Sequence, residues 1–199
     1  MLQLIETICW ENGDFQRLPL HEERMYRSGK YFFGKTSRLS LADVLAMPAS
    51  YRNLKVKCRV TYSENIDNIE YEPYTPKSVR SLQLVEDDTI DYSFKLRNRD
   101  ALNRLYELRG ESDDILIVKD GLITDSSYAN IIFLKDGVWF TPEFPLLKGT
   151  RREYYLQHGM ICSMSIRPGD LWQFEAARLI NAMLSMEEGD PIPVANIRS

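Results

Sequence analysis

Cysteine and histidine are scarce in this sequence of 199 residues, with three and two copies respectively. The cysteines are odd in number, widely spaced and flanked by apolar or strand-forming residues, at Cys9, Cys58 and Cys162. Such a pattern favours buried free thiols over disulfides or a metal centre. Two histidines, His21 and His158, provide little material for a zinc site or a histidine-based triad. We therefore expect no metal.

The sequence also lacks a basic excess, a long apolar run and internal repeats. Its 25 basic and 29 acidic residues give a net charge of −4, whereas general nucleic-acid binders usually carry a basic excess. No apolar run reaches membrane-spanning length, and residues 1–6 lack the basic and apolar regions of a secretion signal. These absences predict a cytoplasmic protein with a small-molecule partner, and neither nucleic acid nor membrane as a partner.

Residues 1–90 read as a mostly antiparallel sheet with two helices. An apolar run over residues 2–10 predicts a strand that ends at the Asn12-Gly13 turn. Residues 54–62 alternate strictly between apolar and polar side chains, which is the period of a half-buried strand. A helix is expected from about Leu20, and a second one over residues 40–47, with Ser40 as its N-cap and Pro48 after its end.

Residues 91–199 combine short strands with helices. Strands are predicted at 115–118, 129–134, 138–141 and 161–166, and helices at 101–108, 150–158 and 172–186. Such a mixture indicates an α/β layer or a distorted barrel. We therefore predict an α+β fold with a two-layer N-terminal domain, residues 1–90, and a C-terminal pseudo-barrel domain, residues 91–199.

The most informative stretch is residues 121–133, where an acid and an amide interrupt an apolar, strand-forming run. Asp125 and Asn130 are these two polar residues, and a buried acid needs partners. Gly149 and Thr150 follow at an expected helix start, where backbone N–H groups and the helix dipole attract an anion. We expect the two pieces to form parts of one pocket.

Two further features suggest what this pocket holds. Lys95 interrupts an aromatic strand-like run, and His21, Arg24 and Ser28 share one face of the first helix. A lysine for an aldehyde, an acid for a ring nitrogen and a phosphate cradle are together what pyridoxal phosphate requires. Each feature alone has a structural alternative: an edge lysine with its head in solvent, a solvated helix face, or a turn acid.

The order of these motifs resembles the class IV aminotransferase family of pyridoxal-phosphate enzymes, over nearly the whole chain. The resemblance is carried by His21-x-x-Arg24 with Ser28, by Lys95 before a helix start, by Asp125 five residues before Asn130, by Thr141-Pro142, and by Leu147-x-Gly149-x-x-Arg152. The chain departs from the family pattern in three ways. Aspartate stands at 125 in place of glutamate, Arg151 replaces a small hydroxyl residue, and the chain is shorter than most members.

The resemblance implies an enzyme with pyridoxal 5'-phosphate as its cofactor and a homodimer as its assembly. Lys95 would be the catalytic lysine and Asp125 the partner of the ring nitrogen, with Asn130 as an anchor. The phosphate would be held by Arg24, Gly149, Thr150 and Arg151. Lesser candidates are Ser126, Ser127, Tyr128 and Arg59, the last as a clamp for a substrate carboxylate.

Family members differ in the fate of the amino substrate, and the motifs do not separate the outcomes. The small size favours a 4-amino-4-deoxychorismate lyase, which forms 4-aminobenzoate and pyruvate in folate biosynthesis. The alternative is an aminotransferase acting on branched-chain or D-amino acids. A second alternative is a module that binds the cofactor or a partner without catalysis.

Overall fold

The computed structural model describes residues 2–199, which form two compact units that are considered separately below. Unit 1 consists of Met1–Thr75 and Phe94–Asn98, and unit 2 of Pro76–Ser93 and Arg99–Ser199. The boundary expected between residues 90 and 91 falls inside the segment Pro76–Ser93, which is part of unit 2. The division at this boundary into two folding domains stays a prediction.

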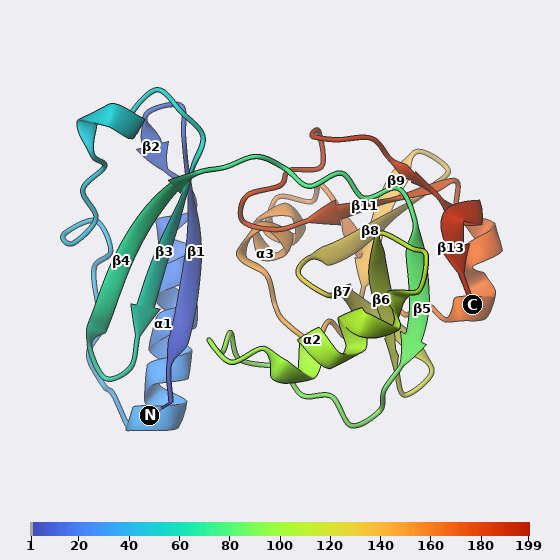
Figure 1. Ribbon diagram of the computed structural model, residues 1–199, viewed down its shortest axis with the longest axis horizontal. Coiled ribbons are helices and arrows are strands. Elements are labelled where there is room, and N and C mark those ends of the chain that lie inside the picture. The colour runs from blue at the N-terminus through green and yellow to red at the C-terminus, as the bar shows by residue number, and fades with distance from the viewer. Residues whose placement is uncertain (1) are drawn as a thin grey trace. The chain divides into compact units, whose positions relative to one another are not determined.

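Unit 1 is a four-stranded antiparallel sheet with one long helix on one face (Figure 1). The strands, in the spatial order β2-β1-β3-β4, are β2 Asp14–Phe15, β1 Leu4–Glu11, β3 Val56–Tyr62 and β4 Ile66–Pro73, and the helix is α1 Leu18–Phe33. Alternate residues of β1 and β3 pack against Met25 of α1 in one apolar core. The strict alternation along residues 54–62 therefore predicted the buried face of β3 correctly.

Helix α1 ends where the chain adopts the left-handed conformation. Gly34 has a φ of 66°, and its N–H reaches the carbonyl of Lys30 while the next N–H reaches Gly29. This arrangement satisfies the last carbonyls of the helix, and glycine takes the conformation without steric strain. The predicted helix near Leu20 is thereby confirmed.

The second helix predicted in this region, over residues 40–47, is wrong. The segment forms a single turn in which Leu45 bonds back to Leu41, and Ser40 caps no helix. Instead, the N–H of Leu41 donates to the Glu22 side chain at 2.6 Å, and Leu41 and Leu45 are buried in the core. The apolar residues whose spacing suggested a helix here instead pack a single turn against the core.

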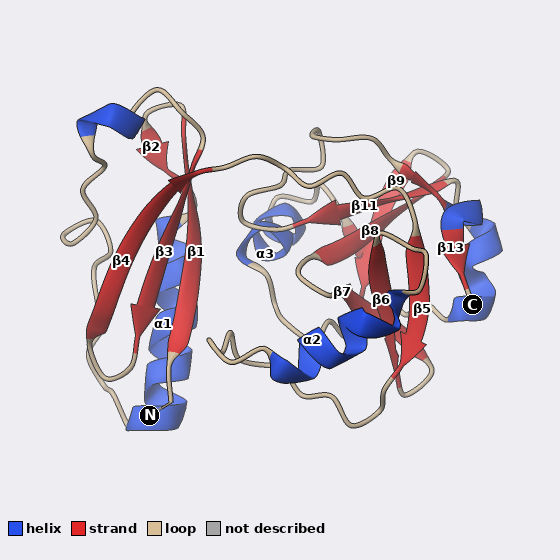
Figure 2. Cartoon of the chain, viewed as in Figure 1, coloured by secondary structure: helices blue, strands red, loops and turns tan. Residues whose placement is uncertain are grey.

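Unit 2 is built mainly of strands, with shorter helices at its surface (Figure 2). The main path of its sheet has the order β10-β9-β8-β7-β6-β5-β13. Along the chain, the strands are β5 Leu82–Glu86, β6 Asp114–Lys119, β7 Leu122–Ser126, β8 Asn130–Lys135, β9 Val138–Pro142, β10 Cys162–Met164, β11 Ala176–Ile180, β12 Ile192–Pro193 and β13 Ile197–Arg198. The helices α2 Asp100–Tyr106 and α3 Thr150–Gln157 match two predicted helices. The predicted α+β class is confirmed.

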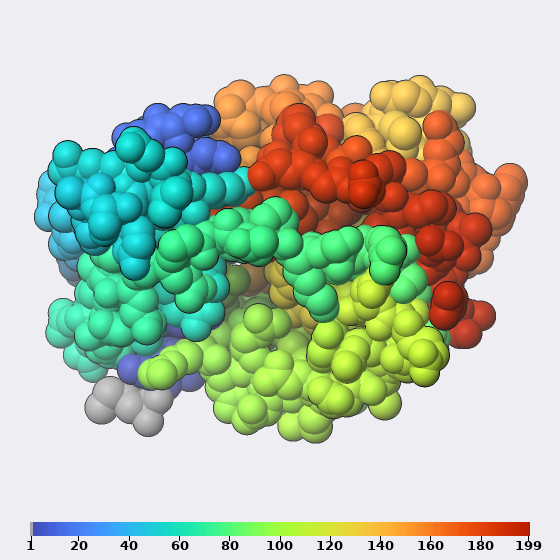
Figure 3. All heavy atoms as spheres, turned by 45° about the horizontal axis from the view of Figure 1, so that its top comes forward, coloured from blue at the N-terminus to red at the C-terminus, as the bar shows by residue number. Residues whose placement is uncertain are grey.

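The third predicted helix in this region, over residues 172–186, is wrong. A 3-10 turn over Pro168–Gln173 is followed by β11, which pairs antiparallel with β8 along its whole length. The short run Ala-Ala-Arg-Leu-Ile fits a helix or a strand locally, and its pairing with the buried β8 decides the outcome. In the space-filling view, the C-terminal residues in red lie against the residues of unit 2 coloured orange (Figure 3).

Candidate functional site

The Asp125 carboxylate in unit 2 is held by two neutral donors. Asp125 lies at the end of β7, directly opposite Asn130 at the start of β8. Its Oδ1 accepts from the Asn130 Nδ2 at 2.7 Å, and its Oδ2 accepts from the backbone N–H of Leu147 at 2.9 Å. The five-residue spacing therefore closes a hairpin in which the two side chains meet.

The amide of Asn130 ties this hairpin to the segment before α3. Its Nδ2 also donates to the carbonyl of Leu147 at 2.8 Å. The Asn130 Oδ1 lies so close to Gly149 that a Cβ placed there would be 2.1 Å away. Only glycine fits at this position without moving Asn130, which gives a physical reason for the Leu-x-Gly motif. The structure thus brings Asp125, Asn130 and Gly149 together, as predicted.

The N-terminus of α3 lies directly beside this cluster. Gly149 is the N-cap and no side chain caps the helix, and Thr150 and Arg151 begin it in buried positions. The backbone N–H groups of a first helical turn attract anions. Arg152 joins the next motif to the cluster, because its guanidinium donates to the Thr141 hydroxyl at 3.3 Å and to the Pro142 carbonyl at 2.9 Å.

Burial dominates the electrostatics of Asp125. The residue is 5% exposed, and loss of hydration raises the pKa of its carboxyl to about 6, although the hydrogen bonds from Leu147 and Asn130 and the nearby charge of Arg152 oppose the shift. A buried carboxylate of this kind is stabilised by a nearby cation, and a protonated ring nitrogen would be such a cation.

In unit 1, Arg24 is paired with an acid that the sequence did not single out. Glu6 on β1 is fully buried and accepts from the Arg24 Nε at 2.8 Å and from its Nη2 at 2.5 Å. His21, one turn earlier on α1, contacts the same carboxylate through its Nδ1 at 2.6 Å. Ser28, the third residue of the helix face, is also buried. The predicted polar stripe therefore faces the sheet and not solvent.

The charge of Arg24 determines the state of Glu6. Burial by itself raises the pKa of Glu6, but the charge of Arg24 and the hydrogen bonds from Arg24 and His21 together lower it to about 2. Burial lowers the pKa of His21, because its charged form loses hydration, while Glu6 acts in the opposite direction. The cluster is therefore a charge-assisted pair of Glu6 and Arg24 with a histidine beside it.

Lys95 belongs to unit 1, where its segment extends the sheet beside the N-terminal half of β1. The carbonyl of Lys95 accepts from the N–H of Ile5 at 3.0 Å, and Leu96 pairs with Leu4. Phe94 and Leu96 pack against the apolar core that includes Met25 of α1. The backbone of Lys95 and the side chain of Arg24 thus contact neighbouring residues of β1, Ile5 and Glu6.

Three of the four lesser candidates contact other parts of unit 2, and the fourth is exposed on unit 1. The Ser126 hydroxyl accepts from two backbone N–H groups of the β7–β8 turn, and the Ser127 carbonyl accepts from the Arg99 guanidinium at 2.6 Å. Tyr128 packs against the apolar core of unit 2, and Arg59 is exposed on β3. Their proposed roles at the site stay predictions.

Sequence reasoning missed two residues of these clusters, Glu6 and Arg152. Glu6 could have been found as a charge at a core-facing position, since Leu4 and Ile8 flank it with the period of a strand. Arg152 was part of a recognised motif but was not given a role. A cavity of about 320 Å³ in unit 1, between α1, residues 35–44 and the β3–β4 turn, contains none of the predicted site residues.

Comparisons with known proteins identify the family of this chain. The family model of amino-transferase class IV matches residues 3–188. An uncharacterized protein of Haemophilus influenzae is 38% identical over 185 residues, which cover 92% of this chain and 98% of that protein. The crystal structure of a proposed 4-amino-4-deoxychorismate lyase from Haemophilus somnus has a TM-score of 0.86 at 35% identity and covers 92% of this chain and 97% of its own. A proposed aminodeoxychorismate lyase of Schizosaccharomyces pombe is 25% identical over 174 residues, 79% of this chain and 74% of that protein.

The chain therefore belongs to the class IV aminotransferases, a family of enzymes that depend on pyridoxal phosphate. Each unit contains groups that fit this cofactor. Unit 2 has a buried acid without a bonded cation and a helix N-terminus without a side-chain cap. Unit 1 has a lysine held by its backbone and a buried arginine. Among the described residues, no helix is long and apolar enough to cross a membrane.

Proposed function

We propose that this protein is a 4-amino-4-deoxychorismate lyase, which splits its substrate into 4-aminobenzoate and pyruvate. The observation that carries the proposal is the likeness to the Haemophilus somnus protein, which extends over 92% of this chain at 35% identity. The likeness to the Schizosaccharomyces pombe protein points to the same reaction. The buried acid, the helix start and the arginine cluster supply groups for the cofactor that this reaction uses.

The phosphate group of the cofactor is assigned to Arg24 and to the backbone of Gly149, Thr150 and Arg151. Arg24 brings a guanidinium that Glu6 holds in one orientation, since two of its nitrogens are bonded to that carboxylate. The first turn of α3 brings N–H groups whose direction the helix sets. Asn130 holds Gly149 in place by filling the space where a Cβ would lie.

Lys95 and Asp125 carry the chemical roles. Pyridoxal phosphate, when bound, supplies an aldehyde that holds an amino group and a ring that accepts electrons. Lys95 would hold this aldehyde through its Nζ and, once released from it, would serve as the base for the proton on the amino-bearing carbon of the substrate. Asp125 would hold a proton on the ring nitrogen, and that positive charge would stabilise its own buried carboxylate.

The products of the purified enzyme test the proposal. Loaded with pyridoxal phosphate and given 4-amino-4-deoxychorismate, the protein should release 4-aminobenzoate and pyruvate in equal amounts, measured by chromatography. Lys95→Ala should release neither above background, while Lys30→Ala, at an exposed position in the last turn of α1, should act as the wild type. Formation of keto acids from L- or D-amino acids, without 4-aminobenzoate, would identify an aminotransferase instead. A protein that takes up the cofactor but converts none of these substrates would be a binding module.

We also propose that the protein works as a homodimer in the cytoplasm. The family resemblance supports the dimer, and the absence of a membrane-spanning helix among the described residues is consistent with the location. Sedimentation at micromolar concentration should give the mass of two chains. A monomer that is fully active at that concentration would contradict the assembly, and recovery of the native protein in a membrane fraction would contradict the location.

A further inference from the structure

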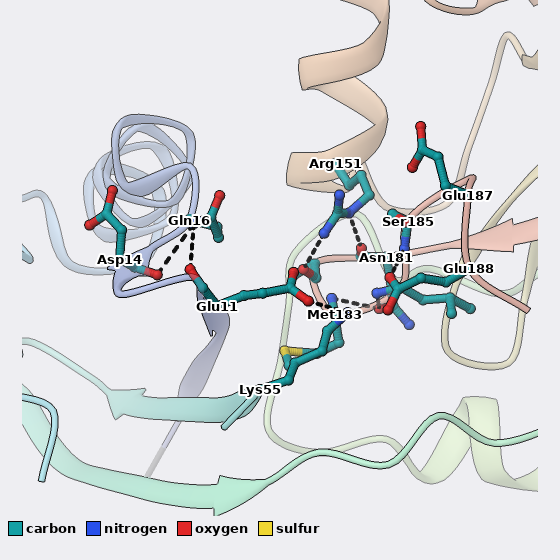
Figure 4. Close-up of polar contacts among 12 residues, drawn as sticks. Glu11, Asp14, Gln16, Lys55, Arg151, Asn181, Met183, Ser185, Glu187 and Glu188 are labelled. Carbon is teal, nitrogen blue, oxygen red and sulfur yellow. Dashed lines mark hydrogen bonds and ion pairs between the residues drawn. The ribbon is translucent and has the colours of Figure 1, made fainter. Parts of the chain in front are cut away.

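The side chain of Arg151 points toward the segment that follows β11 in unit 2 (Figure 4). Its Nε donates to the carbonyl of Asn181 at 2.8 Å, and its Nη2 donates to the carbonyl of Ala182 at 3.1 Å. Arg151 is only 7% exposed. A planar guanidinium can bind two successive carbonyls through one rigid fork, whereas a lysine ammonium has no such fork and a hydroxyl has a single donor.

These two carbonyls belong to a tight turn that follows β11. The Asn181 side chain accepts from the N–H groups of Met183 at 2.8 Å and of Leu184 at 3.0 Å. The backbone N–H of Asn181 in turn reaches the carbonyl of Leu184 at 3.0 Å. The N–H groups of Asn181, Met183 and Leu184 are thus bonded within the turn, and Arg151 donates to its carbonyls at 181 and 182.

Tyr155, four residues after Arg151 and on the same side of α3, continues the contact. Its hydroxyl accepts from the N–H of Met186 at 3.1 Å and lies 3.4 Å from the carboxylate of Glu187. The guanidinium of Arg151 lies 5.9 Å from the Tyr155 ring. One face of α3 therefore holds residues 181–187, beginning with the second residue of the helix.

The buried charge of Arg151 has no carboxylate within ion-pair distance among the described residues. Its partners in unit 2 are two backbone carbonyls and the hydroxyl and ring of Tyr155. Arg151 is thus a cation next to the proposed phosphate site whose side chain serves a second segment.

We infer that Arg151 is a positioning residue that joins the phosphate site to the Asn181–Leu184 turn. Its backbone belongs to the helix start that receives the phosphate, and its side chain fixes the turn. Phosphate binding should therefore stabilise residues 181–187 as well as α3. This coupling rests on the proposed function, whereas the support of the turn by Arg151 does not.

Amide hydrogen exchange on the full-length protein tests the inference. In Arg151→Thr, which restores a small hydroxyl residue, the amides of Met183, Leu184 and Met186 should exchange about tenfold faster without ligand, because charged hydrogen bonds to the turn are lost. Arg151→Lys keeps the charge but not the planar fork. Exchange in the turn should therefore still be faster in Arg151→Lys than in the wild type.

Arg178→Thr is the matched control. Arg178 donates to the carbonyls of Glu188 and Gly189 in the same segment but does not belong to α3. Its replacement should leave the amides of the turn and the binding of phosphate unchanged. In the wild type, added pyridoxal phosphate should slow exchange in the turn, and in Arg151→Thr it should not.

Wild-type exchange rates in Arg151→Thr or in Arg151→Lys would overturn the inference. Failure of the proposed function would give a different result. If the wild type binds no pyridoxal phosphate, the amides of the turn should still exchange faster in Arg151→Thr than in the wild type in the absence of ligand.

Discussion

Each of the two polar clusters contains a buried carboxylate, and these two carboxylates are held in opposite ways. In unit 1, Glu6 is bound by the guanidinium of Arg24, and its pKa falls to about 2. In unit 2, Asp125 is bound by an amide and a backbone N–H, and its pKa rises to about 6. Burial alone raises the pKa of both acids, so the difference comes from the bonded cation.

The contrast shows that the bonded partners suit the two buried acids to different roles. Glu6 is a permanent anion whose charge is already matched, so it is suited to hold Arg24 in place. At a pH near 6, the protonated and ionised forms of Asp125 are about equally stable. A cation placed beside it therefore favours the ionised form. This is the behaviour required of a group that keeps a proton on a ring nitrogen.

Removing the charge of Glu6 should have the largest effect on stability. Glu6→Gln removes the carboxylate charge that is bonded to the buried Arg24 guanidinium, and breaking a buried pair in this way typically lowers the free energy of unfolding by about 3–5 kcal/mol. Urea denaturation near neutral pH measures the loss. Glu72→Gln is the control, since Glu72 pairs with Lys57 on the same sheet but has a side chain that is 59% exposed. That variant should lose less than about 1 kcal/mol. Equal losses in the two variants would contradict the role of Glu6.

The pH dependence of stability should distinguish the two acids. The folded-state pKa of Asp125 is raised from 3.8 to about 6, so its stabilising contribution is complete below pH 3.8 and lost as the pH rises through about 6. The loss is about 3 kcal/mol without cofactor. Glu6 has a pKa lowered from 4.5, so its contribution is present above pH 4.5 and lost as the pH falls toward about 2.

The variant Asp125→Asn isolates the first of these dependences. Unfolding free energies of the cofactor-free wild type and variant, measured from about pH 4 to pH 8, should converge or cross, because only the wild type loses stability as its buried acid ionises. The change with pH is compared, and not the absolute stability, since the variant also loses the bond from Asn130. Parallel curves would show that Asp125 ionises as an ordinary surface acid does.

A methyl group at Gly149 should have a smaller effect, confined to unit 2. In Gly149→Ala, the new Cβ would lie 2.1 Å from the Asn130 Oδ1, so the amide has to move away from Asp125 or Leu147. Overpacking of this kind costs about 1–3 kcal/mol, measured by thermal unfolding. Gly169→Ala is the control, because a Cβ there meets no atom within 4 Å. If both variants unfold together with the wild type, Asn130 does not depend on glycine at 149.

The sequence predicted those parts of the site that lie within one element or one hairpin. The face of α1 follows from helical spacing, and the meeting of Asp125 with Asn130 follows from a tight hairpin between two strands. Glu6 was missed because its partners lie 15 and 18 residues later on another element. The direction of the Arg151 side chain was also beyond reach, since its partners follow by 30 and 31 residues.

The same limit explains the two wrong helices. Residues 172–186 and 40–47 each contain apolar residues at spacings that a helix allows. Pairing with β8 makes Ala176–Ile180 a strand, and the bond from Leu41 to Glu22 keeps the other segment as a single turn. In both segments, contacts with distant residues outweigh the local preference.

Reduction of the loaded protein with borohydride, followed by peptide mapping, tests the central claim most directly. Borohydride fixes pyridoxal phosphate to whichever lysine holds it, and mass spectrometry identifies that residue. We predict that the label is found on Lys95, that Lys95→Ala carries none, and that the absorbance of the bound cofactor disappears on reduction. A label on another lysine, or a wild-type protein that takes up no cofactor, would contradict the account.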